Sequence, residues 1–227
     1  MKNLSTFLTI LISTIMIAQN NPQPTVDVTG EGIIRVVPDE VTITVRVENT
    51  GSEVKALKAT NDRIVNDVLL TIKKMGIEDK YVQSEYVRLS KNYEYNTKTY
   101  NYAANQTISI YLKNLKKYEP LMDALMASGI NRIDGISFSS SDNMALESQA
   151  RKKAVENAQM KAGEYTSVLN QTIGKAVSIS ESQSVVGPQP IFRAMAMEGD
   201  TVAGKQTLAP GELEIRCVVN IRFILNQ

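Results

Sequence analysis

The stretch VTGEGIIRVVPDEVTITVRV, residues 28–47, decides the fold because it predicts two strands on either side of a turn. Its second half places an apolar side chain at every second position, which is typical of a half-buried strand. Pro38 fixes its own φ angle and has no N–H to donate, so it marks the turn. With Pro38 and Asp39 as the loop, Glu31 faces Arg46 and the apolar faces coincide. We therefore expect a hairpin, in this register or in one shifted by two residues.

The first 18 residues, MKNLSTFLTILISTIMIA, predict an export signal. Lys2 precedes an apolar run without charge, and Ala18 supplies the small residue that cleavage requires. The run is short for a bilayer span of ~20 residues, so we expect cleavage before Gln19. Retention as an anchor is the alternative. The mature chain, residues 19–227, is therefore expected outside the cytoplasm.

Composition argues against several classes of function. The full chain has 25 basic and 24 acidic residues, so the loss of Lys2 leaves 24 of each and a net charge of zero. A neutral chain offers no electrostatic surface for nucleic acid. Histidine is absent and Cys217 is the single cysteine, so no imidazole base, thiolate cluster or internal disulfide can form. We expect no enzymatic activity, catalytic residue, metal site or cofactor; a hydrolase that uses only carboxylates stays open.

Two motif matches fail on their context. Residues 199–205, GDTVAGK, have the spacing of a phosphate-binding loop, but Gln206 stands where a magnesium-binding hydroxyl is needed. No strand precedes this match and no helix follows it. Ser52 with Lys55, and the triplet at residues 141–143, resemble penicillin-binding serine motifs, but no Lys-Thr-Gly follows. We interpret both as helix N-terminal caps.

Apolar periodicity locates the other elements. Helices are predicted at residues 52–75, 117–128 and 142–170, and strands at residues 81–93, 100–112, 133–140, 173–181 and 212–225. Gly76 and Gly129 end the first two helices, and Gly135 marks an irregular strand. Residues 183–211 have no period and form a long loop, which in a compact domain is usually functional or disordered.

These elements predict an α+β fold: an antiparallel or mixed sheet with helices packed on it, in the order β-β-α-β-β-α-β-α-β-loop-β. One domain over residues 19–227 is expected, with two subdomains as the alternative. The third helix carries a stripe of small residues, which either allows close approach to a sheet or reflects helix propensity alone. The stripe consists of Leu146, Ala150, Ala154, Ala158 and Ala162. Cys217 falls on the apolar face of the last strand, which predicts a buried, unreactive thiol.

Tyrosine gathers in one part of the chain. Of the nine tyrosines, seven lie between Tyr81 and Tyr111, around the polar hairpin tip EYNTKTYNY. The candidate self-association residues are Tyr93, Tyr95, Tyr100 and Tyr102. Rings at a hairpin tip cannot all reach the core, and tyrosine suits a surface that is wet before assembly. The alternatives are cross-strand pairing that stabilises the hairpin, and a platform for a carbohydrate or peptide.

Four ordered segments resemble the SIMPL-domain family of exported bacterial proteins. They are the opening stretch at residues 28–47, INRIDGISFS, ARKKAVENAQMKAGEY and the terminal LAPGELEIRCVVNIRFIL. The resemblance implies a periplasmic protein, free or associated with the outer membrane, or secreted. It implies a non-enzymatic homo-oligomer, ring- or channel-like, with a role in envelope or oxidative-stress tolerance. The family has no agreed catalytic residues, so none is carried over.

Two functions of different classes follow. The first is an envelope protein that self-assembles, and the second is a periplasmic binding module for a small molecule or peptide. An exposed aromatic surface would favour the first, and a deep pocket in the monomer the second.

Overall fold

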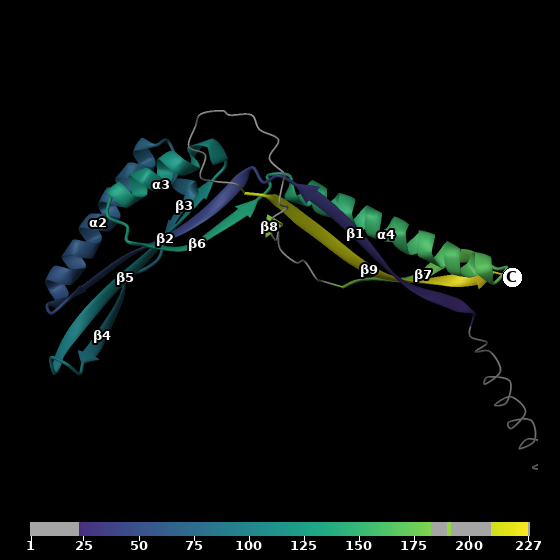
Figure 1. Cartoon of the computed structure of the whole chain (residues 1–227), viewed down its shortest axis with the longest axis horizontal. Coiled ribbons are helices and arrows are strands. Elements are labelled where there is room, and N and C mark those ends of the chain that lie inside the picture. Colours follow the sequence, from purple (N-terminus) through teal and green to yellow (C-terminus); the bar gives the residue numbers. More distant parts are fainter. Residues whose placement is uncertain (1–22, 183–189, 192–209, 227) are drawn as a thin grey trace, which may run out of the picture. The chain divides into compact units, whose positions relative to one another are not determined.

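The computed structural model describes residues 23–182, 190–191 and 210–226. The predicted export signal, residues 1–18, and the phosphate-loop match at residues 199–205 lie outside the described residues. Most of the predicted loop at residues 183–211 also lies outside them. Figure 1 shows the course of the described helices and strands.

Strands and helices alternate along the chain, which confirms the predicted α+β class. In order they are β1 (Thr25–Val36), β2 (Glu40–Gly51), α2 (Val54–Lys74), η1 (Asp79–Tyr81), β3 (Val82–Ser84), β4 (Arg88–Glu94), β5 (Thr99–Leu112), η2 (Leu115–Lys117), α3 (Tyr118–Ala127), β6 (Arg132–Ser139), α4 (Asn143–Val168), β7 (Thr172–Ser182), β8 (Pro190–Ile191) and β9 (Glu212–Asn226). They divide into two compact units. Unit 1 consists of Met1–Ile34, Glu147–Val185 and Arg216–Gln227, and unit 2 of Arg35–Leu146 and Val186–Ile215.

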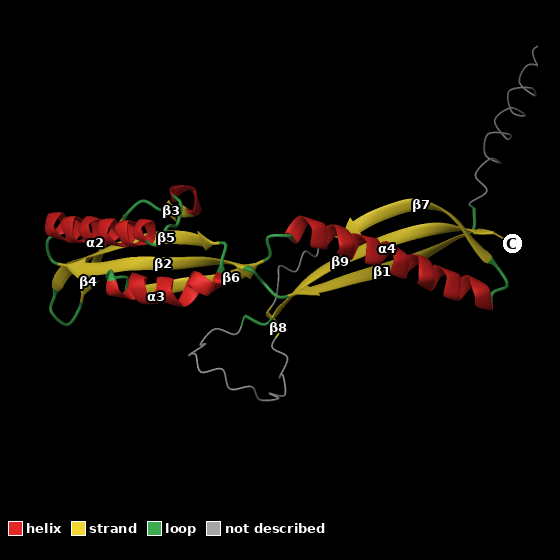
Figure 2. Cartoon of the chain, turned by 90° about the horizontal axis from the view of Figure 1, so that it is seen from above, coloured by secondary structure: helices red, strands yellow, loops and turns green. Residues whose placement is uncertain are grey.

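Unit 2 is built on a five-stranded sheet in the order β3-β5-β2-β6, with β4 also paired to β5. The central strand β2 pairs antiparallel with β5 from Val41 to Gly51 and with β6 on its other side. Helices α2 and α3 lie along this sheet (Figure 2). The apolar side chains of β2 and β5 meet those of both helices in one core, which includes Val41, Ile43, Val45, Val47, Val68, Ile72, Ile108, Ile110, Leu121 and Leu125.

The predicted hairpin within residues 28–47 is wrong, because its two strands belong to different sheets. β1 pairs with β9, whereas β2 has β5 on one side and β6 on the other, so both of its edges are occupied. The charged side chains pair within their own sheets and not across the predicted hairpin. Glu31 forms an ion pair with Arg216, and Arg46 forms one with Asp134 at 2.6 Å. A proline turn is also unsuited to a tight two-residue hairpin. The alternation located the strands correctly without identifying their partners.

Unit 1 packs α4 directly against β1 (Figure 2), so of the two interpretations of the small-residue stripe the structure has the close approach to a sheet. The four alanines of the stripe are fully buried. Two glycines of β1 face them: a Cβ atom at Gly30 would lie 2.0 Å from the carbonyl oxygen of Ala154, and one at Gly32 would lie 2.0 Å from that of Ala150. The helix and the strand therefore meet backbone to backbone at Gly30 and Gly32, where β1 has no room for a side chain.

The outer edge of β1 is covered by side chains of α4. The Oδ1 atom of Asn157 accepts a hydrogen bond from the backbone N–H of Glu31 (3.1 Å), and Lys161 Nζ donates to the carbonyl oxygen of Thr29 (2.9 Å). Residues 29 and 31 direct their backbone groups to the same edge, because the pattern repeats at every second residue. An edge strand whose polar groups already have partners is a poor template for another chain.

The single strand predicted at residues 81–93 is wrong, because this stretch contains the end of η1 and two separate strands, β3 and β4, with residues 85–87 between them. The short strand β8 lies within the predicted loop at residues 183–211.

The ends of the other elements agree with the sequence except at the start of α2. Its N-cap is Glu53 rather than Ser52: the carboxylate accepts hydrogen bonds from the N–H groups of Lys55 (3.1 Å) and Ala56 (2.6 Å). A negative group at this position also complements the helix dipole. Gly76 follows the helix with a φ of 72°, as expected for a C-terminal glycine. The predicted irregularity at Gly135 is confirmed by a shift in register between β2 and β6.

Candidate functional site: the tyrosine hairpin

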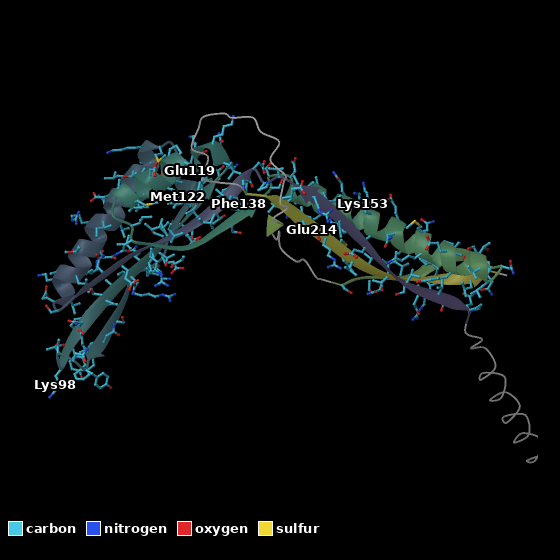
Figure 3. All side chains as sticks on the ribbon, in the orientation of Figure 1. Lys98, Glu119, Met122, Phe138, Lys153 and Glu214 are labelled. Carbon is cyan, nitrogen blue, oxygen red and sulfur yellow. The ribbon has the colours of Figure 1, made fainter. Side chains whose placement is uncertain are left out.

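The four predicted tyrosines lie on and beside the turn of the β4–β5 hairpin in unit 2. Figure 3 labels Lys98, which belongs to this turn and has a positive φ of 51°. The last residues paired are Glu94 and Thr99, so residues 95–98 form a four-residue connection. The amide of Asn101 donates to the Glu94 carboxylate across the hairpin (2.9 Å). This hydrogen bond links the two strands next to the turn.

Three of the tyrosines form a ring cluster. Tyr93 and Tyr100 are opposed in register, and their ring centroids lie 5.0 Å apart. Tyr95 meets Tyr93 edge-on, with centroids 5.1 Å apart. Lys91 adds a cation–π contact, because its Nζ atom lies 3.9 Å from the centroid of Tyr100. The sequence did not reveal this lysine, since its place opposite Tyr102 depends on the strand register.

The cluster remains open to solvent. Tyr95 is 84% exposed, Tyr100 54% and Tyr93 42%. Tyr102 lies two residues further along β5 and is half-buried, so the structure brings three of the four candidates together at the exposed end. The cross-strand pairing proposed as the alternative is present. The same pairing also orders an exposed aromatic face, because each ring limits the rotation of its neighbour.

Sequence reasoning missed a groove on the sheet face of unit 2 opposite the apolar core. Its volume is about 500 Å³, and β2, β4, β5 and β6 contribute to its walls. Arg46 donates to Asp134 within it (Nε to Oδ2, 2.7 Å), and the buried Oδ1 atom of Asn105 has no hydrogen-bond partner among the described residues. Thr42, Thr44 and Arg46 alternate with the apolar residues of β2, so the sequence shows a polar face. It gave no sign that the face is hollowed.

A further polar cluster surrounds the start of β2. The Tyr111 hydroxyl donates to the carboxylate of the buried Glu40, and this hydrogen bond raises the pKa of Tyr111 to about 12. The ring of Tyr81 lies 5.6 Å from that of Tyr111. A hydrogen bond with Lys113 lowers the pKa of Tyr81. The Tyr111 hydroxyl thus supplies the donor that a buried carboxylate needs.

The described part of the chain contains neither a candidate metal cluster nor a candidate membrane-spanning helix. Within residues 23–182, 190–191 and 210–226, no three histidine, cysteine, aspartate or glutamate side chains gather in a way that could hold a metal ion. None of the helices formed by these residues is long and apolar enough to cross a membrane.

Cys217 is buried on the apolar face of β9, which confirms its predicted position. Burial raises the pKa of its thiol, and the nearby Glu181 carboxylate adds to the effect. The sulfur lies 3.7 Å from the Oε1 atom of Glu181, to which the thiol can donate. A protonated, covered thiol is a poor nucleophile.

We expect Cys217 to react slowly with a thiol reagent at pH 8 in the native protein and rapidly after unfolding in urea. Replacement by serine should lower the free energy of unfolding by roughly 1–3 kcal/mol, because a hydroxyl is costlier to bury than a thiol. The loss in the free energy of unfolding should be about 1 kcal/mol, since the Glu181 carboxylate can accept a hydrogen bond from the serine hydroxyl. Labelling rates followed by mass spectrometry, with and without urea, provide the measurement. Equal rates in both conditions would contradict the buried position.

Two curated relatives match this chain over almost its whole length. The 26 kDa periplasmic immunogenic protein of Brucella melitensis is 26% identical over 242 residues, covering 96% of this chain and 97% of the relative. The uncharacterized protein YggE of Escherichia coli K12 is 24% identical over 216 residues, covering 92% of this chain and 88% of the relative. Among solved structures, the de novo designed protein Foldit4 covers 45% of this chain with a TM-score of 0.27 and 11% identity, too low for an argument.

The family model SIMPL, described as a protein of unknown function (DUF541), matches residues 26–223. This match begins in β1 and ends in β9, so it spans both units. It also confirms the resemblance carried by the four sequence segments. The chain therefore belongs to the SIMPL family.

Proposed function

We propose that this chain is a non-enzymatic cell-envelope protein that self-associates through its tyrosine hairpin. The observation that carries the proposal is the exposed cluster of Tyr93, Tyr95 and Tyr100. Tyrosine is enriched at protein interfaces, where its ring contributes apolar area and its hydroxyl tolerates water before assembly. The rings are already ordered by one another. Association therefore loses less side-chain entropy than it would with free rings.

The mass of the mature protein in solution tests this proposal. Residues 19–227 would be studied by light scattering and native mass spectrometry from micromolar to near-millimolar concentration. We expect a mass that exceeds one chain and rises with concentration to a defined oligomer. A strictly monomeric protein throughout this range would remove the proposal. The ring- or channel-like form and the role in stress tolerance implied by the resemblance remain predictions.

The proposed location is the periplasm. The apolar run that ends at Ala18 supports export, and one relative is named a periplasmic protein. We expect the mature chain to begin at Gln19. Mass spectrometry of the N-terminus, on protein recovered from the periplasmic fraction of the native host, checks this point. Intact Met1 on protein from the cytoplasmic fraction would contradict it.

The groove of unit 2 supports a second candidate function, a binding module. Its walls carry Arg46 and Arg88 beside Glu85 and Asp134, so the charges balance and favour a small, polar ligand or a short peptide. Replacing Thr107 by phenylalanine would fill the groove. Saturable binding of a di- or tripeptide that this variant abolishes, with the monomer mass unchanged, would favour the binding module.

A further inference from the structure

Two connections of unit 2 that lie far apart in the sequence meet at the β3 edge of its sheet. The first leads from the end of α2 to η1, and the second, residues 113–117, follows β5. The antiparallel register of β3 and β5, in which Val82 opposes Ile110, joins them. It brings the residue before β3, Tyr81, beside Tyr111, and the centroids of their rings lie 5.6 Å apart.

A pocket of about 240 Å³ lies between these connections. Its lining combines apolar residues, the two tyrosines and two lysines, and includes Ile77, Leu112, Tyr81, Tyr111, Lys113 and Lys117. We name it the lysine pocket. The Nζ atom of Lys113 lies 4.8 Å from the centroid of the Tyr81 ring, and that of Lys80 lies 4.9 Å from the same centroid. Positive charge therefore gathers around one aromatic ring at the pocket.

The two connections are strongly positive in a chain that is almost neutral. Residues 73–81 and 113–117 contain six lysines and two acidic residues, a local net charge of +4, whereas the whole chain has a net charge of +1. The buried carboxylate of Glu40 lies beside them and accepts a hydrogen bond from Tyr111. Positive charge is in excess even when Glu40 is counted, so the electrostatic potential at the lysine pocket favours an anion.

Two of the lysines at this pocket have no carboxylate partner. Lys80 forms an ion pair with Glu78 at 2.7 Å, whereas neither lysine of the pocket lining forms one with the residues that the structure describes. Lys117 donates to the backbone carbonyl oxygen of Met75 (3.4 Å), which leaves two of its three N–H donors. The ammonium groups of Lys113 and Lys117 can therefore both donate to an anion in the pocket.

We propose that the lysine pocket binds a small molecule that carries a phosphate monoester. Such a group has a charge of about −1.5 to −2 at neutral pH and three terminal oxygens, which match the donors of two ammonium groups. The apolar and aromatic part of the lining would contact the organic part of the ligand. A volume of about 240 Å³ is below the usual range for drug-sized ligands, so the ligand is small. The pocket shares no lining residue with the groove of unit 2 and lies outside the tyrosine hairpin, so this proposal goes beyond both functions proposed above.

Titration calorimetry of the mature protein, residues 19–227, with phenyl phosphate at pH 7.5 tests the proposal. We expect saturable binding of one phenyl phosphate per chain. Inorganic phosphate should bind more weakly because it has no ring to contact the tyrosines, and phenol, which has no phosphate, should not bind. The affinity should fall as the salt concentration rises from about 0.05 M to about 0.5 M, because ions screen exposed charges. The double variant Lys113→Gln with Lys117→Gln should weaken binding by about tenfold or more, since it removes two charge-assisted contacts.

The matched control is the double variant Lys55→Gln with Lys152→Gln, which removes the same charge from two exposed lysines outside the pocket. It should bind phenyl phosphate as the unchanged protein does, and so should Thr107→Phe, which fills the groove of unit 2. Circular dichroism should show that all variants are folded. The proposal is overturned if phenyl phosphate does not bind, if phenol binds equally well, if the pocket variant keeps its affinity, or if either control variant weakens binding as much. A monomeric protein would leave this result intact, so the proposals can fail separately.

Discussion

Replacement of Gly30 by alanine is expected to lower the free energy of unfolding by about 3 kcal/mol, at the upper end for overpacking. The new Cβ atom would lie 2.0 Å from the carbonyl oxygen of Ala154 and 2.7 Å from the Cβ atom of Ala158. The obstructing atoms belong to the helix backbone and to a side chain too short to turn away. The helix must therefore move off β1 and expose its alanine stripe. Urea unfolding followed by circular dichroism measures the loss.

Gly163→Ala is the matched control, because Gly163 lies in α4 but has no atom within 4 Å of its would-be Cβ. This change should leave stability unchanged or raise it by up to about 1 kcal/mol, since alanine favours a helix more than glycine does. Gly32→Ala should behave like Gly30→Ala, because it meets the carbonyl oxygen of Ala150 at the same distance. A Gly30→Ala protein with the unfolding midpoint of the unchanged chain would refute the contact between α4 and β1.

The double variant Tyr95→Ser with Tyr100→Ser is expected to reduce the oligomeric mass of the mature protein to that of a single chain. Tyr95 has the largest exposed fraction of the three rings, and Tyr100 contacts both the ring of Tyr93 and the Nζ atom of Lys91. Their loss removes most of the accessible aromatic area, and a few aromatic anchors usually carry most of the affinity of an interface. Light scattering over a concentration series measures the change. Circular dichroism should stay nearly unchanged, because neither ring belongs to the core of unit 2.

Tyr86→Ser is the matched control for this experiment. Tyr86 is 96% exposed and lies between β3 and β4, outside the ring cluster. The substitution removes an exposed tyrosine from the same unit without altering the hairpin, so the mass should stay as in the unchanged protein. If the double variant keeps its full mass, the rings serve only to stabilise the hairpin by cross-strand pairing. The predicted loop at residues 183–211 would then become the better candidate for assembly.

The sequence located most elements because their apolar periods are long and uninterrupted. β9 illustrates this: its alternation placed Cys217 on the buried face, where the structure has it. The sequence did not identify which strands pair with each other. Periodicity reports which face of a strand is buried, but backbone hydrogen bonds carry no side-chain signature, so a strand can join a distant partner instead of the next one along the chain. The alternation alone therefore predicts that β1 pairs with β2, the next strand along the chain.

For the candidate site too, the sequence identified the residues but not the contacts between them. Composition pointed to the tyrosines, and the structure brings Tyr93, Tyr95 and Tyr100 into contact. Lys91, the groove beside Arg46 and the glycine contacts of β1 depend on register or on the approach of two backbones, and one sequence does not show these. Asn61 is an intermediate case. It interrupts the apolar stripe of α2, and the structure explains it by a hydrogen bond from its amide to Gln106 (Nδ2 to Oε1, 2.8 Å).

The pairing of β1 with β9 sets an order of folding for an exported chain. Asp27 on β1 and Arg222 on β9 are joined by a hydrogen bond although they lie 195 residues apart in the sequence. In contrast, β2 and the two strands that pair with it lie within residues 40–139. A chain that crosses a membrane N-terminus first delivers all of these unit 2 strands well before β9. Joining ends so far apart is entropically costly, and contacts of this kind form slowly. Unit 2 can therefore fold during translocation, while β1 waits unpaired until the last residues have emerged.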